Sequence, residues 1–419
     1  MQGSRTSWMP IVLIVAILAA LAGLTWVNYR FSIQNPGGND FLARWNGAHF
    51  WLVEGVSPYD PQVGKAAQQM IYGRPADPSR NEDAALFVYP LFSMVFFGPF
   101  GLLDYTLARA LWMTLLEVAL VLLSVVSLRM AGWKLSSLGV GIVFLASLLW
   151  YNGARTIILG QFSGLNALLM AAAVYFIWRG YDFGPGILLA LSLSKPQMSF
   201  LLAPFVLLWA LSVKRYRLLL SFLGAFGLLM LATLALIPDW PLQWLRELVA
   251  YPEYTGRIGS VVSVVANAMP GIGKPVSLFL YALFGLYLLY EWVRVWGRDA
   301  NSFLWTAMMT LVVTNIVAPR TATPHYVALL PVVFMLFSAW QERWGRAGRV
   351  LEWLLALLLV VGQWALFLAT VKGNEEAAVM YLPIPILCLL GLWWVRWWLV
   401  RPPKLLYEQL LEIEGRKVQ

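Results

Sequence analysis

A series of long apolar segments is the feature that most constrains how this chain can fold. The first runs from Met9 to Val27 and is about as long as a helix that crosses a hydrocarbon core. Others follow at roughly 86–103, 106–128, 136–151, 163–178, 183–194, 197–213, 217–237, 275–293, 302–318, 326–340, 350–370 and 379–399. Backbone groups in lipid must be satisfied within their own segment, so these runs are expected to be helices. The pattern predicts an all-α polytopic membrane protein.

The composition supports this class and excludes others. Of the 419 residues, 60% are hydrophobic and only 12% are charged, which excludes a soluble globular domain. The net charge of +9 does not indicate a nucleic-acid partner, because the basic residues stand at the ends of apolar runs. The single cysteine, Cys388, cannot form an internal disulfide. The apolar stretch within Met1–Val27 is too long for the h-region of a typical signal peptide, and no small-residue cleavage site follows it, so this segment is expected to be a retained anchor.

The basic residues also predict an orientation, because short cytoplasmic loops of membrane proteins are rich in Lys and Arg. The Lys and Arg at alternate connections are Arg129, Lys134, Arg179, Lys214, Arg215, Arg217, Arg294, Arg298, Arg343, Arg346, Arg349, Arg401 and Lys404. With these in the cytoplasm, the segments outside are 28–85, 152–162, 238–274, 319–325 and 371–377. The long loops 28–85 and 238–274 are the two that could carry a site.

This orientation requires that one of the two runs between Ala85 and Met130 does not cross. The run 86–103 contains Tyr89-Pro90 and Pro99, so we expect it to re-enter or to lie partly buried. About twelve transmembrane helices and two cytoplasmic termini then follow, with thirteen crossings as the alternative. We expect one membrane domain over 1–419, in the cell membrane, ending in a cytoplasmic tail at 400–419.

Polar residues gather at the external boundary of this arrangement. Asp40 follows the first apolar run closely, where a carboxylate can ionise and still reach a lipid headgroup; it could also be an ordinary solvated acid. Ionisable groups at membrane depth usually face a cavity or a partner, so each is a candidate site residue. The others are Arg44, Tyr59, Tyr89, Arg155, Gln161, Lys195, Arg257, Arg320 and His325.

Lys195 stands out among them, because Ser194-Lys195-Pro196 joins two apolar runs without a loop. The proline favours extended geometry at Lys195 and interrupts the helix there. The residue is either a lysine that snorkels to the interface or a cation that meets a lipid phosphate, and Arg155 permits the same two interpretations. His325 begins an apolar run and is either a satisfied interfacial side chain or a functional one.

Taken in order, these motifs resemble glycosyltransferase family 87 of the GT-C superfamily, polytopic enzymes that use polyprenyl-phosphate sugars. The similarity covers roughly the first 330 residues. The matching elements are Asp40-Phe41, Gly55 to Pro61, Tyr89-Pro90, Gly160-Gln161, Lys195-Pro196 and Pro324-His325-Tyr326. The chain departs from the family pattern at Leu91, where a second proline is common, and at Ser163, where asparagine is frequent.

The resemblance implies a GT-C-type fold and Asp40 as the catalytic base of an inverting transfer, with His325 as a second catalytic residue. A base is needed because an acceptor hydroxyl is a poor nucleophile until a carboxylate takes its proton. The polyprenyl phosphate is already a good leaving group and needs cations rather than an acid. The implied phosphate ligands are Lys195, Arg155, Arg257 and Arg320, and the implied substrate contacts are Arg44, Tyr59, Tyr89 and Gln161.

The resemblance also implies the partners: a polyprenyl-phosphate sugar donor, with mannose as the expected sugar, a lipid or glycan acceptor, and membrane lipids. We expect no cofactor and no metal, because a tight divalent site needs several converging oxygen ligands. The best local acid pair, Glu82-Asp83, looks like part of a solvated loop.

Two other functions stay open at this stage. A transporter or lipid flippase would be expected to have repeated halves and broken helices near mid-membrane. The halves of this chain show no internal similarity, and the polar residues lie at one boundary. A GT-C transferase with a protein acceptor is the other alternative.

Overall fold

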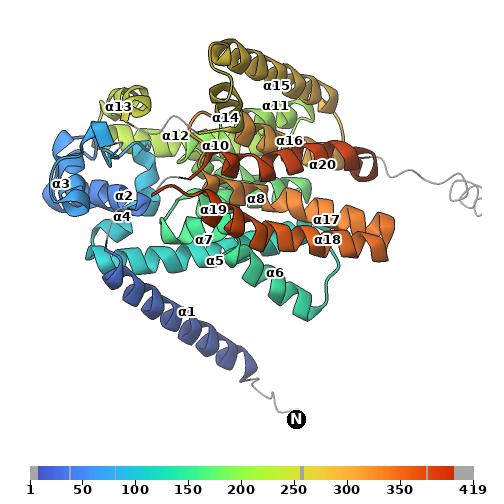
Figure 1. Ribbon diagram of the computed structural model, residues 1–419, viewed down its shortest axis with the longest axis horizontal. Helices are drawn as coiled ribbons and strands as arrows, with labels where there is room; N and C mark the ends of the chain where they lie inside the picture. Colours follow the sequence, from blue (N-terminus) through green and yellow to red (C-terminus); the bar gives the residue numbers. More distant parts are fainter. Residues whose placement is uncertain (1–7, 37–38, 81, 255–258, 374–375, 401–419) are drawn as a thin grey trace, which may run out of the picture.

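The computed structural model describes residues 8–36, 39–80, 82–254, 259–373 and 376–400, and this part is helical without strands (Figure 1). The first half contains α1 (Met9–Gln34), α2 (Asp40–His49), η1 (Phe50–Glu54), α3 (Pro61–Tyr72), η2 (Pro78–Arg80), η3 (Leu91–Ser93), α4 (Met94–Gly101), α5 (Tyr105–Ala131), α6 (Ser137–Leu149), α7 (Tyr151–Ile158), α8 (Ser163–Trp178), α9 (Phe183–Ser192), α10 (Pro196–Ser199) and α11 (Leu202–Ser212). The second half contains α12 (Tyr216–Leu236), α13 (Trp240–Tyr254), α14 (Val261–Asn267), α15 (Gly273–Val295), α16 (Ala300–Val317), η4 (Thr323–Leu329), α17 (Leu330–Trp344), α18 (Arg346–Leu357), η5 (Leu358–Gly362), α19 (Gln363–Thr370), η6 (Ala378–Tyr381) and α20 (Pro383–Val400).

The predicted all-α polytopic fold is confirmed. Among the described residues, eight helical segments are long and apolar enough to cross a membrane, or nine if the bent pair α6–α7 counts as one span. Four shorter apolar helices lie among them: Leu91–Gly101, Ser163–Trp178, Phe183–Ser192 and Leu202–Ser212. The number twelve therefore stays a prediction. The predicted tail 400–419 lies almost wholly outside the described residues.

The run 86–103 forms only η3 and the short helix α4, which contains Pro99 and packs against α2. Eight residues of α-helix rise about 12 Å, far less than the ~30 Å of a hydrocarbon core. This segment is too short to cross, as expected for a re-entrant or partly buried element.

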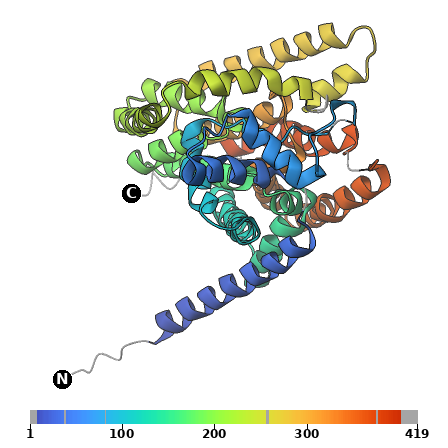
Figure 2. The same ribbon diagram turned by 90° about the vertical axis from the view of Figure 1, so that its left-hand side faces the viewer.

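The helix α1 leaves the bundle at an angle, as Figure 2 shows, and its contact with the rest runs along α5. Hydrogen bonds between polar side chains join α1 to α5. The Asn28 amide donates to the Glu117 carboxylate at 2.9 Å and to the Thr114 hydroxyl at 3.1 Å. Such bonds between helices are favoured in lipid because no water competes for the polar groups.

The segment predicted to be the first external loop folds into α2, η1 and α3, and local signals set the boundaries of these helices. The side chain of Asn39 accepts the Leu42 N–H at 3.1 Å and caps α2, which begins at Asp40. The side chain of Asp60 caps α3 in the same way, with Pro61 in the first helical position.

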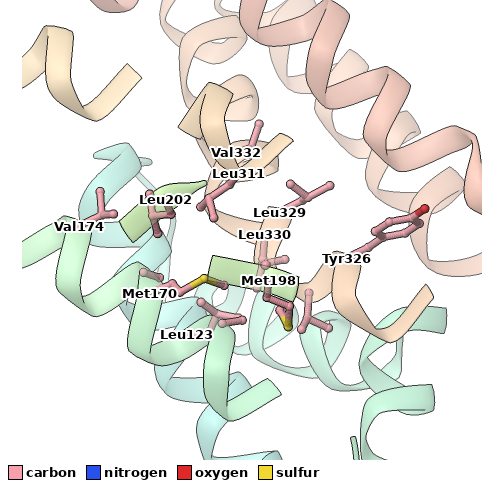
Figure 3. Close-up of a cluster of buried hydrophobic side chains, with 14 of the residues drawn as sticks. Leu123, Met170, Val174, Met198, Leu202, Leu311, Tyr326, Leu329, Leu330 and Val332 are labelled. Atoms are coloured by element: carbon pink, nitrogen blue, oxygen red, sulfur yellow. The ribbon is translucent and has the colours of Figure 1, made fainter. Parts of the chain in front are cut away.

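A cluster of apolar side chains fixes the middle of the bundle (Figure 3). Leu123 of α5, Leu311 of α16 and Leu329 of η4 are fully buried there, together with Met170 of α8. The Tyr326 hydroxyl donates to the Tyr381 carbonyl at 2.9 Å and ties η4 to η6. This core therefore holds η4 and α8, two of the elements that carry candidate site residues, in a fixed relation.

The orientation can be tested with two cysteines in a Cys388→Ala background. Gln69 on α3 and Ala347 on α18 are both exposed and were chosen for opposite sides of the membrane. An impermeant maleimide added to intact cells should label Gln69→Cys and leave Ala347→Cys unlabelled until the cells are opened, because the basic loops are predicted to lie in the cytoplasm. Labelling of Ala347→Cys in sealed cells, with Gln69→Cys protected, would reverse the assigned orientation.

Candidate active site

Asp40 and Arg44 form the outer part of the site, one turn apart on α2. The Asn39 cap places Asp40 in the first turn, where the helix dipole favours a carboxylate. Arg44 donates to the backbone carbonyl of Asp40, and its Nη1 lies 3.5 Å from Asp40 Oδ1. The Asp40 side chain is 28% exposed and that of Arg44 12%, so the carboxylate is the more accessible of the two.

Tyr89 lies on the inner side of Arg44. The guanidinium stands 4.8 Å from the centre of the tyrosine ring, and its Nη2 is 3.5 Å from the hydroxyl. Tyr59 fixes the backbone at Tyr89, because the Tyr59 hydroxyl donates to the Tyr89 carbonyl at 2.6 Å. Burial raises the pKa of Tyr59, so this hydroxyl remains protonated and keeps its role as a donor.

Lys195 is the deepest cation of the site and is 1% exposed. Its backbone is not helical (φ −126°, ψ 78°), as expected for a residue before proline, and it separates α9 from α10. The ammonium donates to the Gln161 side-chain oxygen at 2.7 Å and interacts electrostatically with Tyr89, Arg44 and Asp40. No carboxylate in the described residues lies within ion-pair distance of it. The main direct partner of this buried charge is a neutral amide.

The turn before α8 explains why Gln161 lies beside the start of α2. Gly160 has a φ of +63°, and a Cβ at this position would lie 2.6 Å from the Cβ of Phe41. The Phe41 N–H donates to the Leu159 carbonyl at 3.3 Å, and the Trp112 indole donates to the Gly160 carbonyl at 2.9 Å. Glycine is therefore needed both for the backbone conformation and for the close approach of the two segments.

His325, in η4, belongs to the same group and is buried. It interacts electrostatically with Lys195 and Arg44. Its Nδ1 accepts the Ala322 N–H at 3.3 Å, which assigns the ring proton of the neutral imidazole to Nε2. In this tautomer the free nitrogen of His325 is a hydrogen-bond donor rather than a base.

Arg155 lies in a separate, neighbouring cluster centred on Glu376. The carboxylate accepts from Arg155 Nε at 3.1 Å, from the Tyr151 hydroxyl at 2.6 Å and from the Thr323 hydroxyl at 2.8 Å. Thr323 stands two residues before His325, so the clusters share η4. The charge of Arg155 is already matched by a carboxylate, in contrast to that of Lys195.

The two remaining predicted phosphate ligands are Arg320 and Arg257. Arg320 is half-buried in the turn between α16 and η4 and has a φ of +64°. Its backbone lies so near Gly259 that a Cβ there would be 2.8 Å from the Arg320 Cα. Arg257 lies outside the described residues.

Two acids near the site were missed by sequence reasoning. The first is Asp83, which interacts with Asp40 and Arg44. Its neighbour Glu82 instead pairs with Arg74 at 2.7 Å, as expected in a surface loop. Desolvation by the surrounding chain raises the pKa of Asp83, although part of the side chain is exposed, and the Asp40 carboxylate raises it further. The second is Glu376, and no motif around either residue signals its position. Within the described ranges, no three His, Cys, Asp or Glu side chains converge as a metal site.

Comparison with known proteins identifies the family of this chain. The family model of glycosyltransferase family 87 matches residues 87–319, more than half of the chain, which include Tyr89, Gln161 and Lys195. An alpha-(1->3)-arabinofuranosyltransferase of Mycolicibacterium smegmatis is 25% identical over 320 residues, which cover 68% of this chain and 71% of that protein. The comparison with solved structures gave no significant match. The resemblance is confirmed: this chain belongs to glycosyltransferase family 87.

Proposed function

We propose that this protein transfers a sugar, mannose in our assignment, from a polyprenyl-phosphate donor to a hydroxyl of a lipid or glycan on the external face of the membrane. The observation that carries the proposal is one continuous group of side chains. It runs from the accessible Asp40 carboxylate through Arg44 and Tyr89 to the buried ammonium of Lys195. The exposed carboxylate at one end of this group suits the acceptor hydroxyl. The buried ammonium at the other end suits the anionic leaving group.

Asp40 is the proposed general base. Its carboxylate takes the proton of the acceptor hydroxyl while that oxygen attacks the anomeric carbon, and the bond from that carbon to the phosphate oxygen breaks. Attack opposite the leaving group inverts the anomeric configuration. Arg44 orients the carboxylate, and the exposure of Asp40 leaves room for the acceptor.

Lys195 is the proposed partner of the donor phosphate, which carries the leaving charge. A phosphate there would give the ammonium a charged partner in a site of low dielectric, where such stabilisation is large. The residue bonds to Gln161, two residues before the start of α8, and the N-terminal end of a helix favours anions. The hydroxyls of Ser163 and Ser194 are fully buried and have no hydrogen-bond partner in the described part of the chain. His325 adds a further donor through Nε2.

An apolar groove offers a path for the isoprenoid tail of the donor. It has a volume of about 550 Å³ and lies between the α10–α11 connection, α15 and α16. Phe200 and Leu201, five and six residues beyond Lys195, line this groove, and so does Pro319, the residue before Arg320. A tail in this groove would place its phosphate toward Lys195.

The proposal is tested by incubating purified protein in liposomes with radiolabelled polyprenyl-phosphate mannose and extracted membrane lipids. Polyprenyl-phosphate arabinofuranose is the parallel donor, because the relative in Mycolicibacterium smegmatis is an arabinofuranosyltransferase. We expect label from the mannose donor in a new lipid or glycan product. Movement of labelled donor across the bilayer without a new product would identify a flippase instead, and label in protein would identify a protein acceptor.

The same assay tests the expectation that no metal takes part. Transfer should survive excess EDTA and should not increase when magnesium or manganese is added, because Lys195 and Arg44 supply the positive charge. Activity lost to EDTA and restored by either ion would contradict this, and would make Asp40 and Asp83 candidate metal ligands.

The Asp40→Asn variant should lose transfer by a factor on the order of 10² to 10⁴, because the amide keeps the shape but cannot take a proton. Asp60→Asn is the matched control: it removes a carboxylate from the same loop, and asparagine caps a helix equally well. Initial rates and thermal stability are measured for both. Near-normal turnover by Asp40→Asn would end its assignment as the base.

The Lys195→Met variant should lower kcat/KM for the donor by roughly 10²- to 10³-fold and leave the KM for the acceptor nearly unchanged. Arg155→Met should have a smaller effect on donor kinetics, since Glu376 already pairs with that guanidinium. Lys65→Met, an exposed lysine on α3, serves as the control. Wild-type donor kinetics in Lys195→Met would place the phosphate site elsewhere.

A further inference from the structure

A second site candidate lies at the end of the bundle opposite α2. The C-terminal ends of α15 and α20 and the start of α16 enclose an open groove of about 520 Å³ there. Figure 1 shows the end of α20 on the far side of the molecule from α2 and α3. The groove is lined by both basic and aromatic side chains, and the proposed transfer reaction uses none of them.

The floor of the groove is an internally neutralised pair. Arg396 donates to both carboxylate oxygens of Glu291, at 2.7 and 2.6 Å, and its guanidinium lies 4.4 Å from the centre of the Trp305 ring. Glu291 is almost completely buried, so this pair is shielded from outside charges. The charge of Arg396 is therefore already balanced.

The mouth of the groove has a surplus of positive charge. Arg294 and Arg298 are exposed, and neither forms an ion pair with another described residue. The one further acid in the lining, Asp299, accepts the Ser302 hydroxyl at 2.5 Å. Two guanidinium groups thus face a single carboxylate that already has a hydrogen bond.

Three indoles of α20 set the depth of this mouth relative to a membrane. Trp393, Trp394 and Trp397 line the groove and are 65%, 53% and 64% exposed. Exposed tryptophans on a membrane helix settle at the headgroup level, with the ring against the chains and the N–H toward water. The arginines beside them are therefore placed at the level of lipid phosphates.

We propose that this groove binds the headgroup of an acidic phospholipid, with its phosphate on Arg294 and Arg298 and its glycerol and upper chains against the tryptophans. Guanidinium groups bind phosphate through paired, charge-assisted hydrogen bonds. A zwitterionic headgroup is disfavoured, because its ammonium would enter a mouth that is already net positive. Basic pockets between the ends of membrane helices are suited to anionic headgroups.

The test uses the full-length protein in detergent, with phosphatidylglycerol and phosphatidylcholine of identical chains as probes and glycerol phosphate as the soluble probe. Bound lipid is counted by native mass spectrometry, and the melting temperature is measured in parallel. Wild-type protein should retain phosphatidylglycerol in preference to phosphatidylcholine and should melt at a higher temperature with it. Equal retention of the two lipids, or equal stabilisation by glycerol phosphate, would overturn the proposal without any variant.

The variant arm compares two double substitutions. Arg294→Gln/Arg298→Gln should weaken phosphatidylglycerol binding by roughly ten- to thirtyfold, since each arginine near a charged lipid surface contributes roughly fivefold and two are removed. Arg129→Gln/Arg179→Gln removes two exposed arginines outside the groove, one in α5 and one directly after α8, and should bind like wild type. Undiminished binding by the first variant, or an equal loss in the second, would contradict the assignment.

Discussion

The buried ammonium of Lys195 is the constraint on which the rest of the site depends. Removing such a charge from water costs several kcal/mol unless partners replace the lost solvation. In this protein the direct partner is the Gln161 amide at 2.7 Å, with Tyr89 and Asp40 contributing electrostatically. Three separate elements must meet at one point for this to hold: the α9–α10 break, the turn before α8, and the segment before η3. A bound phosphate would complete the set of partners.

The helical framework makes that meeting possible through close contacts rather than through flexible loops. Gly160 lets the turn before α8 approach Phe41, which brings the start of α2 within reach of the buried lysine. The apolar core around Leu123, Leu311 and Leu329 fixes η4, and with it His325, against the same elements. Glu376, which pairs with Arg155, also holds η4 in place by accepting the Thr323 hydroxyl. The proposed chemistry therefore stands on well-packed secondary structure.

Much of this could be predicted from the sequence, because hydropathy in lipid leaves little choice of fold. The helices, the interruption at Lys195-Pro196 and the failure of 86–103 to form a full span all follow from local rules. The spacing of Asp40 and Arg44 also places them on one face of a helix. The order of the motifs predicted the family, and the family model confirms it.

Other features depend on tertiary contacts that no local pattern encodes. Arg155 looked equivalent to Lys195 as a phosphate ligand, but Glu376, more than two hundred residues away, pairs with it. Asp83 looked like a solvated loop residue, yet the fold of 28–85 brings it near Asp40. Tyr59 looked like a substrate contact, but its hydroxyl is directed to the Tyr89 backbone. The number of membrane crossings also depends on whether short helices such as α9 and α11 join into one interrupted transmembrane segment.

The most direct test of this account is a cryo-electron microscopy structure with a polyprenyl-phosphonate sugar, a donor analogue that cannot be cleaved. We expect the phosphonate within hydrogen-bonding distance of Lys195 Nζ, the tail in the groove lined by Phe200 and Pro319, and the anomeric carbon facing the Asp40 carboxylate. A phosphonate bound at Arg155 and Glu376, with no contact to Lys195, would contradict it.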